Sequence, residues 1–305
     1  MNLPQHRMLG DLIWKSGSFA LKRRRAAIPS RIETVVLDID HTLIHQLSAY
    51  ASLEKMLGPR EARREFEQQK AEVKSGKKSF LQVKQWGHQI QREHNWTKGD
   101  WSGLADRLFR AWRDEGLIQG VAGAQRQRPD LKIILTTGTS DVFGRRLAQL
   151  LHTHYNLRVD HVVGSQQTFD RKGRVQSLVR FVGDQSRTIP AIEKIPAIQE
   201  TFPTFDPKTT LAISDADPNL LRKVGIGLLI PTSKGKDPAS WISQKFKLYD
   251  LPSKHGAIRR EFVREIILRP REAMREYAAR VQTPLGETDQ FSRRIIRERK
   301  EHLRH

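Results

Sequence analysis

The chain has 305 residues, of which 37% are hydrophobic and 29% are charged, and none is cysteine. This length accommodates one large domain or two modest domains, and the apolar content is too high for a wholly disordered chain. The composition excludes disulfide scaffolds, thiolate metal sites and a cysteine nucleophile, and the apolar runs are too short for an integral membrane protein.

The net charge is +20, and the basic excess is spread along the chain with some enrichment towards both ends. Such a charge attracts polyanions and phosphorylated ligands, although a protein with solvated basic faces has the same composition. We predict a basic N-terminal extension over residues 1–31, which contains an amphipathic pattern but no secretory signal. We therefore expect a cytoplasmic location, while organellar targeting by this basic segment stays open.

Strand and helix patterns alternate after residue 32. An apolar, β-branched strand at 34–37 precedes a long helical region at 45–125. Further strands are expected at 131–135, 159–163, 211–213 and 226–230, with a helix at 143–151 and a hairpin at 168–179. From residue 255 onward the pattern is helical and highly charged, as on a solvated helix. The alternation predicts an α/β fold with a parallel sheet between helices.

Polar residues recur at the ends of these strands, which is where open α/β sheets bind ligands. Asp38 and Asp40 directly follow the first strand, and Thr137 and Asp215 follow later ones. Two carboxylates so close repel one another, so a bound cation favours their ionised forms, and Mg²⁺ suits oxygen ligands. An isolated pair of this kind is more often a turn rich in acidic residues, but the other strand ends favour a site.

The segment Asp38-Ile39-Asp40-His41-Thr42-Leu43 resembles the first motif of the haloacid dehalogenase-like (HAD) superfamily, specifically that of its phosphotransferases. Later segments resemble, in order, the motifs of the phosphoserine phosphatase-like subgroup, which carries a helical C1-type cap. These are residues 134–139, 161–165 with 170–174, 193–194, and 214–217 with 224–225. The resemblance covers about two thirds of the chain.

The resemblance implies a fold and a set of roles. It implies a three-layer Rossmann-like core with a parallel sheet at 32–44 and 126–240, and a helical cap at 45–125. The flanking segments have no counterpart in the resemblance, and from the residues we predict a basic helical C-terminal extension at 241–305. Asp38 would be the nucleophile and Asp40 the general acid and base, with Thr137 and Lys194 holding the phosphate. The ligands of a Mg²⁺ ion would be Asp38, Asp40, Asp215 and Asp217.

The sequence departs from the subgroup in two places. Ser214 stands where the subgroup has glycine, and Asp217 follows Asp215 at a shorter spacing than is usual, so Asp215 is the preferred metal ligand and Asp217 a replacement ligand or a support. No acidic residue follows the first motif before Glu54, although the resemblance leads one to expect an acid that selects an amino-acid substrate. A substrate other than phosphoserine is therefore predicted.

The predicted function is Mg²⁺-dependent hydrolysis of a phosphomonoester through an aspartyl-phosphate on Asp38. The alternative is a catalytically weak protein with this fold that binds nucleic acid or an anionic membrane through its basic extensions. A phosphatase acting on a polyanion would combine the two. Within 45–125, basic and aromatic residues could meet a leaving group, but we expect its tryptophans mainly to fill a small core; these are Trp86, Trp96, Trp101 and Trp112.

Overall fold

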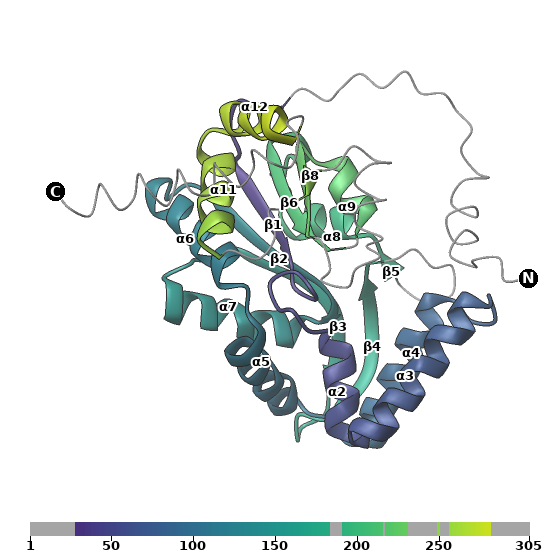
Figure 1. Cartoon of the computed structure of the whole chain (residues 1–305). Coiled ribbons are helices and arrows are strands. Elements are labelled where there is room, and N and C mark those ends of the chain that lie inside the picture. Colours follow the sequence, from purple (N-terminus) through teal and green to yellow (C-terminus); the bar gives the residue numbers. More distant parts are fainter. Residues whose placement is uncertain (1–27, 184–190, 216, 231–248, 251–255, 282–305) are drawn as a thin grey trace, which may run out of the picture.

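The computed structural model describes residues 28–183, 191–215, 217–230, 249–250 and 256–281 (Figure 1). In this part of the chain, eight strands form one sheet in the order β5-β4-β3-β2-β1-β6-β7-β8. The strands are β1 (Thr34–Asp38), β2 (Lys132–Ser140), β3 (His161–Phe169), β4 (Val175–Val182), β5 (Ala191–Ile192), β6 (Thr210–Ser214), β7 (Ile226–Leu229) and β8 (Tyr249–Asp250).

Neighbouring strands run parallel except for β3 and β4, which are antiparallel. These two strands are antiparallel because they form the predicted hairpin, whose turn after Phe169 is too short for the crossover that parallel strands need. Gly173 adopts a φ of 76° there, and Asp170 accepts hydrogen bonds from the backbone N–H groups of Lys172 and Arg174. The sheet is therefore mixed rather than wholly parallel.

Two sets of helices cover the two faces of the sheet. Alternate residues of β1 point to opposite faces, so Val35 and Leu37 join one apolar cluster while Val36 joins the other. Helices α5, α6, α7, α11 and α12 contribute to the first cluster, and α8 and α9 to the second. This arrangement confirms the predicted α/β Rossmann-like architecture in three layers.

The helices span the following residues: α2 (Ser48–Leu57), α3 (Pro59–Lys74), α4 (Phe80–Glu93), α5 (Lys98–Trp112), α6 (Glu115–Gln127), α7 (Asp141–Tyr155), α8 (Lys194–Thr201), α9 (Pro218–Lys223), α11 (Gly256–Leu268) and α12 (Pro270–Val281). Over the described ranges, none of them combines the length and the apolar character needed to cross a bilayer.

Five helices, α2 to α6, lie between β1 and β2 in the sequence. Some of them pack against the sheet, and others lie beyond its end. Helices α5 and α6 pack in the same cluster as the sheet, whereas α3 and α4 stand beyond its end, beside β4 (Figure 1). Trp96 and Trp101 are buried in that shared cluster, but Trp112 is 49% exposed, so it does not fill a core as expected. The domain boundaries 1–31, 32–44, 45–125, 126–240 and 241–305 stay predictions.

Helix α11 is not a solvated extension, because it packs along α6. Val263, Ile266 and Ile267 are fully buried there, and the buried side chain of Arg259 forms an ion pair with Asp114 at the start of α6. Within the predicted basic extensions, residues 1–27, 241–248, 251–255 and 282–305 lie outside the described residues. The predicted amphipathic segment near the N-terminus falls among them.

Gly120 of α6 allows this close packing. A Cβ atom at position 120 would lie 2.7 Å from the backbone oxygen of Arg260, whereas one at Gly123 would meet its nearest neighbour, Arg264, at an ordinary 3.5 Å. Alanine is favoured over glycine in a helix by about 1 kcal/mol, and this gain is the same at both positions. Any difference between the two substitutions therefore comes from the steric contact at position 120.

We expect Gly120→Ala to lower the free energy of unfolding by about 1–3 kcal/mol, because the backbone of α11 must move away. Gly123→Ala should leave it unchanged or raise it by up to about 1 kcal/mol. Urea unfolding of both variants measures the difference. Equal effects of the two substitutions would contradict the close packing of α11 on α6.

Candidate active site

The ends of three neighbouring strands bring the candidate residues together. Strands β1 and β2 pair with Asp38 opposite Thr136, and β1 and β6 pair with Leu37 opposite Ile213. The strands are parallel, so Asp38, Thr137 and Ser214 reach the same edge of the sheet. Lys194 begins α8, and Asp215 directly follows β6.

Asp38 is held by three hydrogen-bond donors and is only 6% exposed. Its Oδ1 accepts the N–H of Ile39 at 3.0 Å, and its Oδ2 accepts the hydroxyl of Ser214 at 2.6 Å and the ammonium of Lys194 at 2.9 Å. Burial raises the pKa of Asp38 above its usual value, while Lys194 opposes that effect. The side chain of Ser214, which replaces a glycine of the resembling motif, thus contacts the candidate nucleophile directly.

Lys194 neutralises part of the charge at this site. Its Nζ lies 2.9 Å from Asp38 and 3.3 Å from Asp217, and the residue is 7% exposed. Burial alone would lower the pKa of Lys194, but the two carboxylates outweigh it and raise that pKa above its usual value. A cation in the first turn of a helix is disfavoured by the helix dipole, so the carboxylates are what stabilise it here.

Asp40 is oriented by groups from two other elements. Its Oδ1 accepts the backbone N–H of Ser48 at 2.6 Å, at the start of α2, and its Oδ2 accepts the hydroxyls of Thr137 at 3.1 Å and Thr139 at 3.3 Å. Thr137 and Thr139 are buried in β2. The hydroxyl of Ser48 also hydrogen-bonds that of Thr139, which links the helical insertion to the sheet at this point.

The two acidic residues after β6 have different surroundings. The backbone N–H of Asp215 donates to the hydroxyl of Thr42 at 3.0 Å, which fixes its loop beside the first motif. Burial and the negative charge of Asp38 raise the pKa of Asp215 to about 7. Asp217, in contrast, pairs with Lys194 and accepts the N–H of Leu220 as the N-cap of α9. Of these two acids, Asp217 thus has a cationic partner, whereas the surroundings of Asp215 disfavour its negative charge.

The donor set suits a hard divalent cation. In the described part of the chain, no three acidic or histidine side chains form a ready-made cage. Mg²⁺ commonly takes only one or two carboxylates, with water and substrate phosphate supplying the rest. Burial and the charge of Asp38 raise the pKa of Asp215, and burial raises that of Asp38, so a cation beside the two carboxylates would favour their ionised forms.

Some residues at the site carried a sequence signal and others did not. Thr139 lies within the second motif-like segment, and Ser214 stood out as a departure from it. Thr42 lies within the first motif-like segment, but its contact with Asp215 was not predicted. Ser48 carried no signal of a site role, because its contact with Asp40 depends on how the chain turns after β1. The chemical roles of these residues stay predictions.

Comparison with known proteins identifies the fold. No family model and no curated protein matches the chain. Among solved structures, a HAD-family hydrolase from Salmonella enterica subsp. enterica serovar Typhi is similar, with 15% identity, a TM-score of 0.55, and coverage of 88% of this chain and 81% of that one. A protein described as having unknown function, from Bordetella pertussis Tohama I, has 16% identity and a TM-score of 0.52, covering 73% of this chain and 99% of that one. The chain therefore has a HAD-like fold, as the resemblance implied.

Replacing the buried lysine tests the charge balance. We expect Lys194→Met to lower the free energy of unfolding by about 3–5 kcal/mol near neutral pH, because it leaves Asp38 and Asp217 buried without their cation. The matched control is Lys223→Met, which removes an exposed ion pair with Glu193 and should cost at most about 1 kcal/mol. Equal losses in urea unfolding would contradict the buried pairing.

The raised pKa of Asp215 predicts an unusual pH dependence. An acid whose pKa is higher in the folded state than in the unfolded state lowers the free energy of unfolding as pH rises between the two pKa values. For Asp215 this range runs from about 4 to about 7. In EDTA at pH 8, Asp215→Asn should therefore raise the free energy of unfolding by up to about 4 kcal/mol, and by much less at pH 5.

Excess Mg²⁺ should raise the Tm of the unsubstituted protein at pH 8 and have little effect on the Asp215→Asn variant, because the variant lacks the anionic ligand. Thermal unfolding at several pH values with and without Mg²⁺ provides both readouts. Parallel pH profiles for the two proteins would show that Asp215 does not carry the raised pKa.

Proposed function

We propose that this protein is a Mg²⁺-dependent hydrolase of phosphomonoesters that uses Asp38 as its nucleophile. One observation carries the proposal: a buried carboxylate with a hydrogen-bonded cation, Lys194, lies at the edge of a HAD-like sheet between two further acids, Asp40 and Asp215. The similar Salmonella protein, named a HAD-family hydrolase, has a TM-score of 0.55 to this chain and agrees with that reading.

The first step is attack of a carboxylate oxygen of Asp38 on the phosphorus of the ester. The bond between phosphorus and the leaving oxygen breaks, and Asp40 donates a proton to that oxygen so that an alcohol leaves. In the second step Asp40, now ionised, takes a proton from water, and the hydroxide attacks phosphorus. Phosphate departs and the carboxylate of Asp38 is restored.

Asp40 suits this double role because its position is fixed before substrate arrives. Three donors from α2 and β2 hold its two oxygens, and the hydroxyls of Thr137 and Thr139 can turn when the carboxyl exchanges a proton. We propose Thr137 as a group that also meets the phosphate, as the resemblance implies. Its hydroxyl is buried beside Asp40, so it would exchange partners when a phosphate oxygen binds.

Charge neutralisation is the main demand on the site, because a phosphate repels an incoming carboxylate. Lys194 supplies one positive charge and Asp217 keeps it in place. A Mg²⁺ ion held by Asp38, the backbone carbonyl of Asp40 and Asp215 would supply Lewis acidity towards a phosphate oxygen. We propose Asp217 as a support for Lys194 rather than a metal ligand, because its carboxylate also caps α9.

Replacing the nucleophile tests the proposal. With Mg²⁺, the protein should release p-nitrophenol from p-nitrophenyl phosphate, and Asp38→Asn should lower kcat by roughly a thousandfold or more, since an amide does not form the intermediate. Glu200→Gln makes the same change in charge at an exposed site and should leave kcat unchanged. EDTA should abolish turnover by the unsubstituted protein. Unchanged turnover in Asp38→Asn would refute the assignment.

A further inference from the structure

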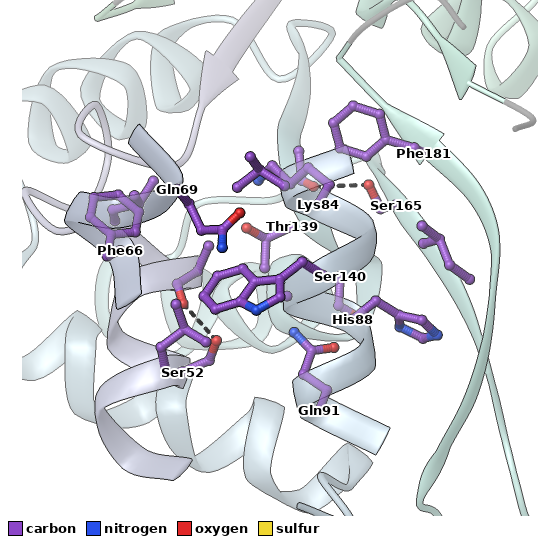
Figure 2. A pocket seen from close by; sticks show the side chains of 18 of the residues that line it. Ser52, Phe66, Gln69, Lys84, His88, Gln91, Thr139, Ser140, Ser165 and Phe181 are labelled. Carbon is purple, nitrogen blue, oxygen red and sulfur yellow. Dashed lines mark hydrogen bonds between the residues drawn. The ribbon is translucent and has the colours of Figure 1, made fainter. Parts of the chain in front are cut away.

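A cavity of about 360 Å³ is lined by residues of helices α2, α3, α4 and α5 and of strands β2, β3 and β4. Figure 2 shows Phe66 and Gln69 on one side of it and Phe181 and His88 on the other, with Thr139 between them. The hydroxyl of Thr139 donates to the carboxylate of Asp40. The cavity therefore begins where the proposed reaction releases its leaving group.

The wall of this cavity is mainly apolar. Its apolar side chains include Leu53, Phe66, Val83, Trp86, Leu178 and Phe181. Most of the polar groups in the wall hydrogen-bond within the protein: Gln69 accepts from Lys78, and Gln91 and His88 bond to Gln167. In the described ranges no acidic residue lines the cavity, whereas two lysines do, Lys70 and Lys84, so the wall has no carboxylate to pair with an ammonium group on a ligand.

Lys84 connects the cavity to the proposed phosphate site. Its Nζ lies 5.8 Å from the ring centroid of Phe181. Burial lowers the pKa of Lys84, and the negative charges of Asp40 and Asp38 oppose that effect. Figure 2 shows Phe66 across the cavity from Phe181. An anionic head with an apolar body matches this distribution of charge.

We propose that the natural substrate is a phosphomonoester of a hydrocarbon-rich alcohol, and that the cavity holds the hydrocarbon while phosphate lies at Asp38. This proposal rests on the proposed function and adds the class of leaving group. At about 30 Å³ for a small group, the cavity has room for roughly a dozen carbon-sized groups. Burial of the hydrocarbon provides the binding energy, because each buried methylene contributes through the hydrophobic effect.

The test compares alkyl phosphates of increasing length, from ethyl to octyl phosphate, kept below the concentrations at which they form micelles. Release of inorganic phosphate gives kcat/KM for each ester in Mg²⁺. We expect kcat/KM to rise about threefold for each added methylene until the cavity is filled. Phosphoserine should be a poor substrate, since its polar groups would enter an apolar wall.

A glycine in the wall provides a variant that fills the cavity. Gly87 lies in α4, and a Cβ atom there would meet nothing within 4 Å. Gly87→Leu should keep the protein folded, because leucine is also a better helix former than glycine. We expect it to lower the ratio of kcat/KM for octyl over ethyl phosphate by at least about tenfold.

The matched control is Gly103→Leu. Gly103 lies in α5, is exposed, also has open space around its Cβ position, and does not line the cavity. The same glycine-to-leucine change in a helix should leave the octyl-to-ethyl ratio unchanged. Equal ratios in the two variants would overturn the proposal, as would a kcat/KM that does not depend on chain length in the unsubstituted protein.

Failure of this proposal is distinguishable from failure of the proposed function. Hydrolysis of every ester with the same kcat/KM would retain the phosphatase and overturn the apolar leaving group. If no ester is hydrolysed, the proposed function fails, and binding of octylphosphonate still tests the cavity through the fluorescence of Trp86 and Trp101, which line it. Weaker binding by Gly87→Leu than by Gly103→Leu is then expected, and equal binding would overturn the cavity assignment.

Discussion

Lys194 forms ion pairs with Asp38 and Asp217 in a place from which water is largely excluded, and the arrangement of the site depends on this charge balance. Lys194 alone does not balance the four carboxylates gathered at this edge of the sheet. Burial is the main cause of the raised pKa values of Asp38 and Asp215, and the negative charge of a neighbouring carboxylate adds to it at each of them. Since buried like charges destabilise a fold, the Mg²⁺ ion that we propose would relieve the repulsion at this site.

The sheet brings these charges together. Parallel pairing of β1 with β2 and with β6 places their carboxyl ends at one edge, and the turn after β1 folds back so that Thr42 contacts the loop after β6. The helices α2–α4 then close the space beyond that edge, with Ser48 bonded to Asp40 and Thr139. The result is one charged end at the sheet and one apolar end among the helices, a division that fits an amphipathic phosphate ester.

Much of this could be predicted from local sequence. The β-branched run before Asp38, the hairpin around Gly173 and the acidic residues at strand ends are signals contained within a few residues, and the structure brings Asp38, Asp40, Thr137, Lys194 and Asp215 to one edge. Contacts between distant segments carried no such signal. The charged pattern of α11 indicated a solvated helix, but its burial depends on Gly120 and Asp114 in α6. The apolar cavity likewise combines residues from four helices and three strands.

In this charge-balanced site we expect Asp38 to become covalently phosphorylated during turnover. Acid quenching of the protein while it hydrolyses an alkyl phosphate, followed by proteolysis and mass spectrometry, locates the phosphoryl group. We expect a peptide that carries one phosphoryl group on Asp38, and we expect this peptide to be absent from Asp38→Asn. Phosphate release without any phosphorylated peptide, or with the phosphoryl group on a different residue, would contradict it.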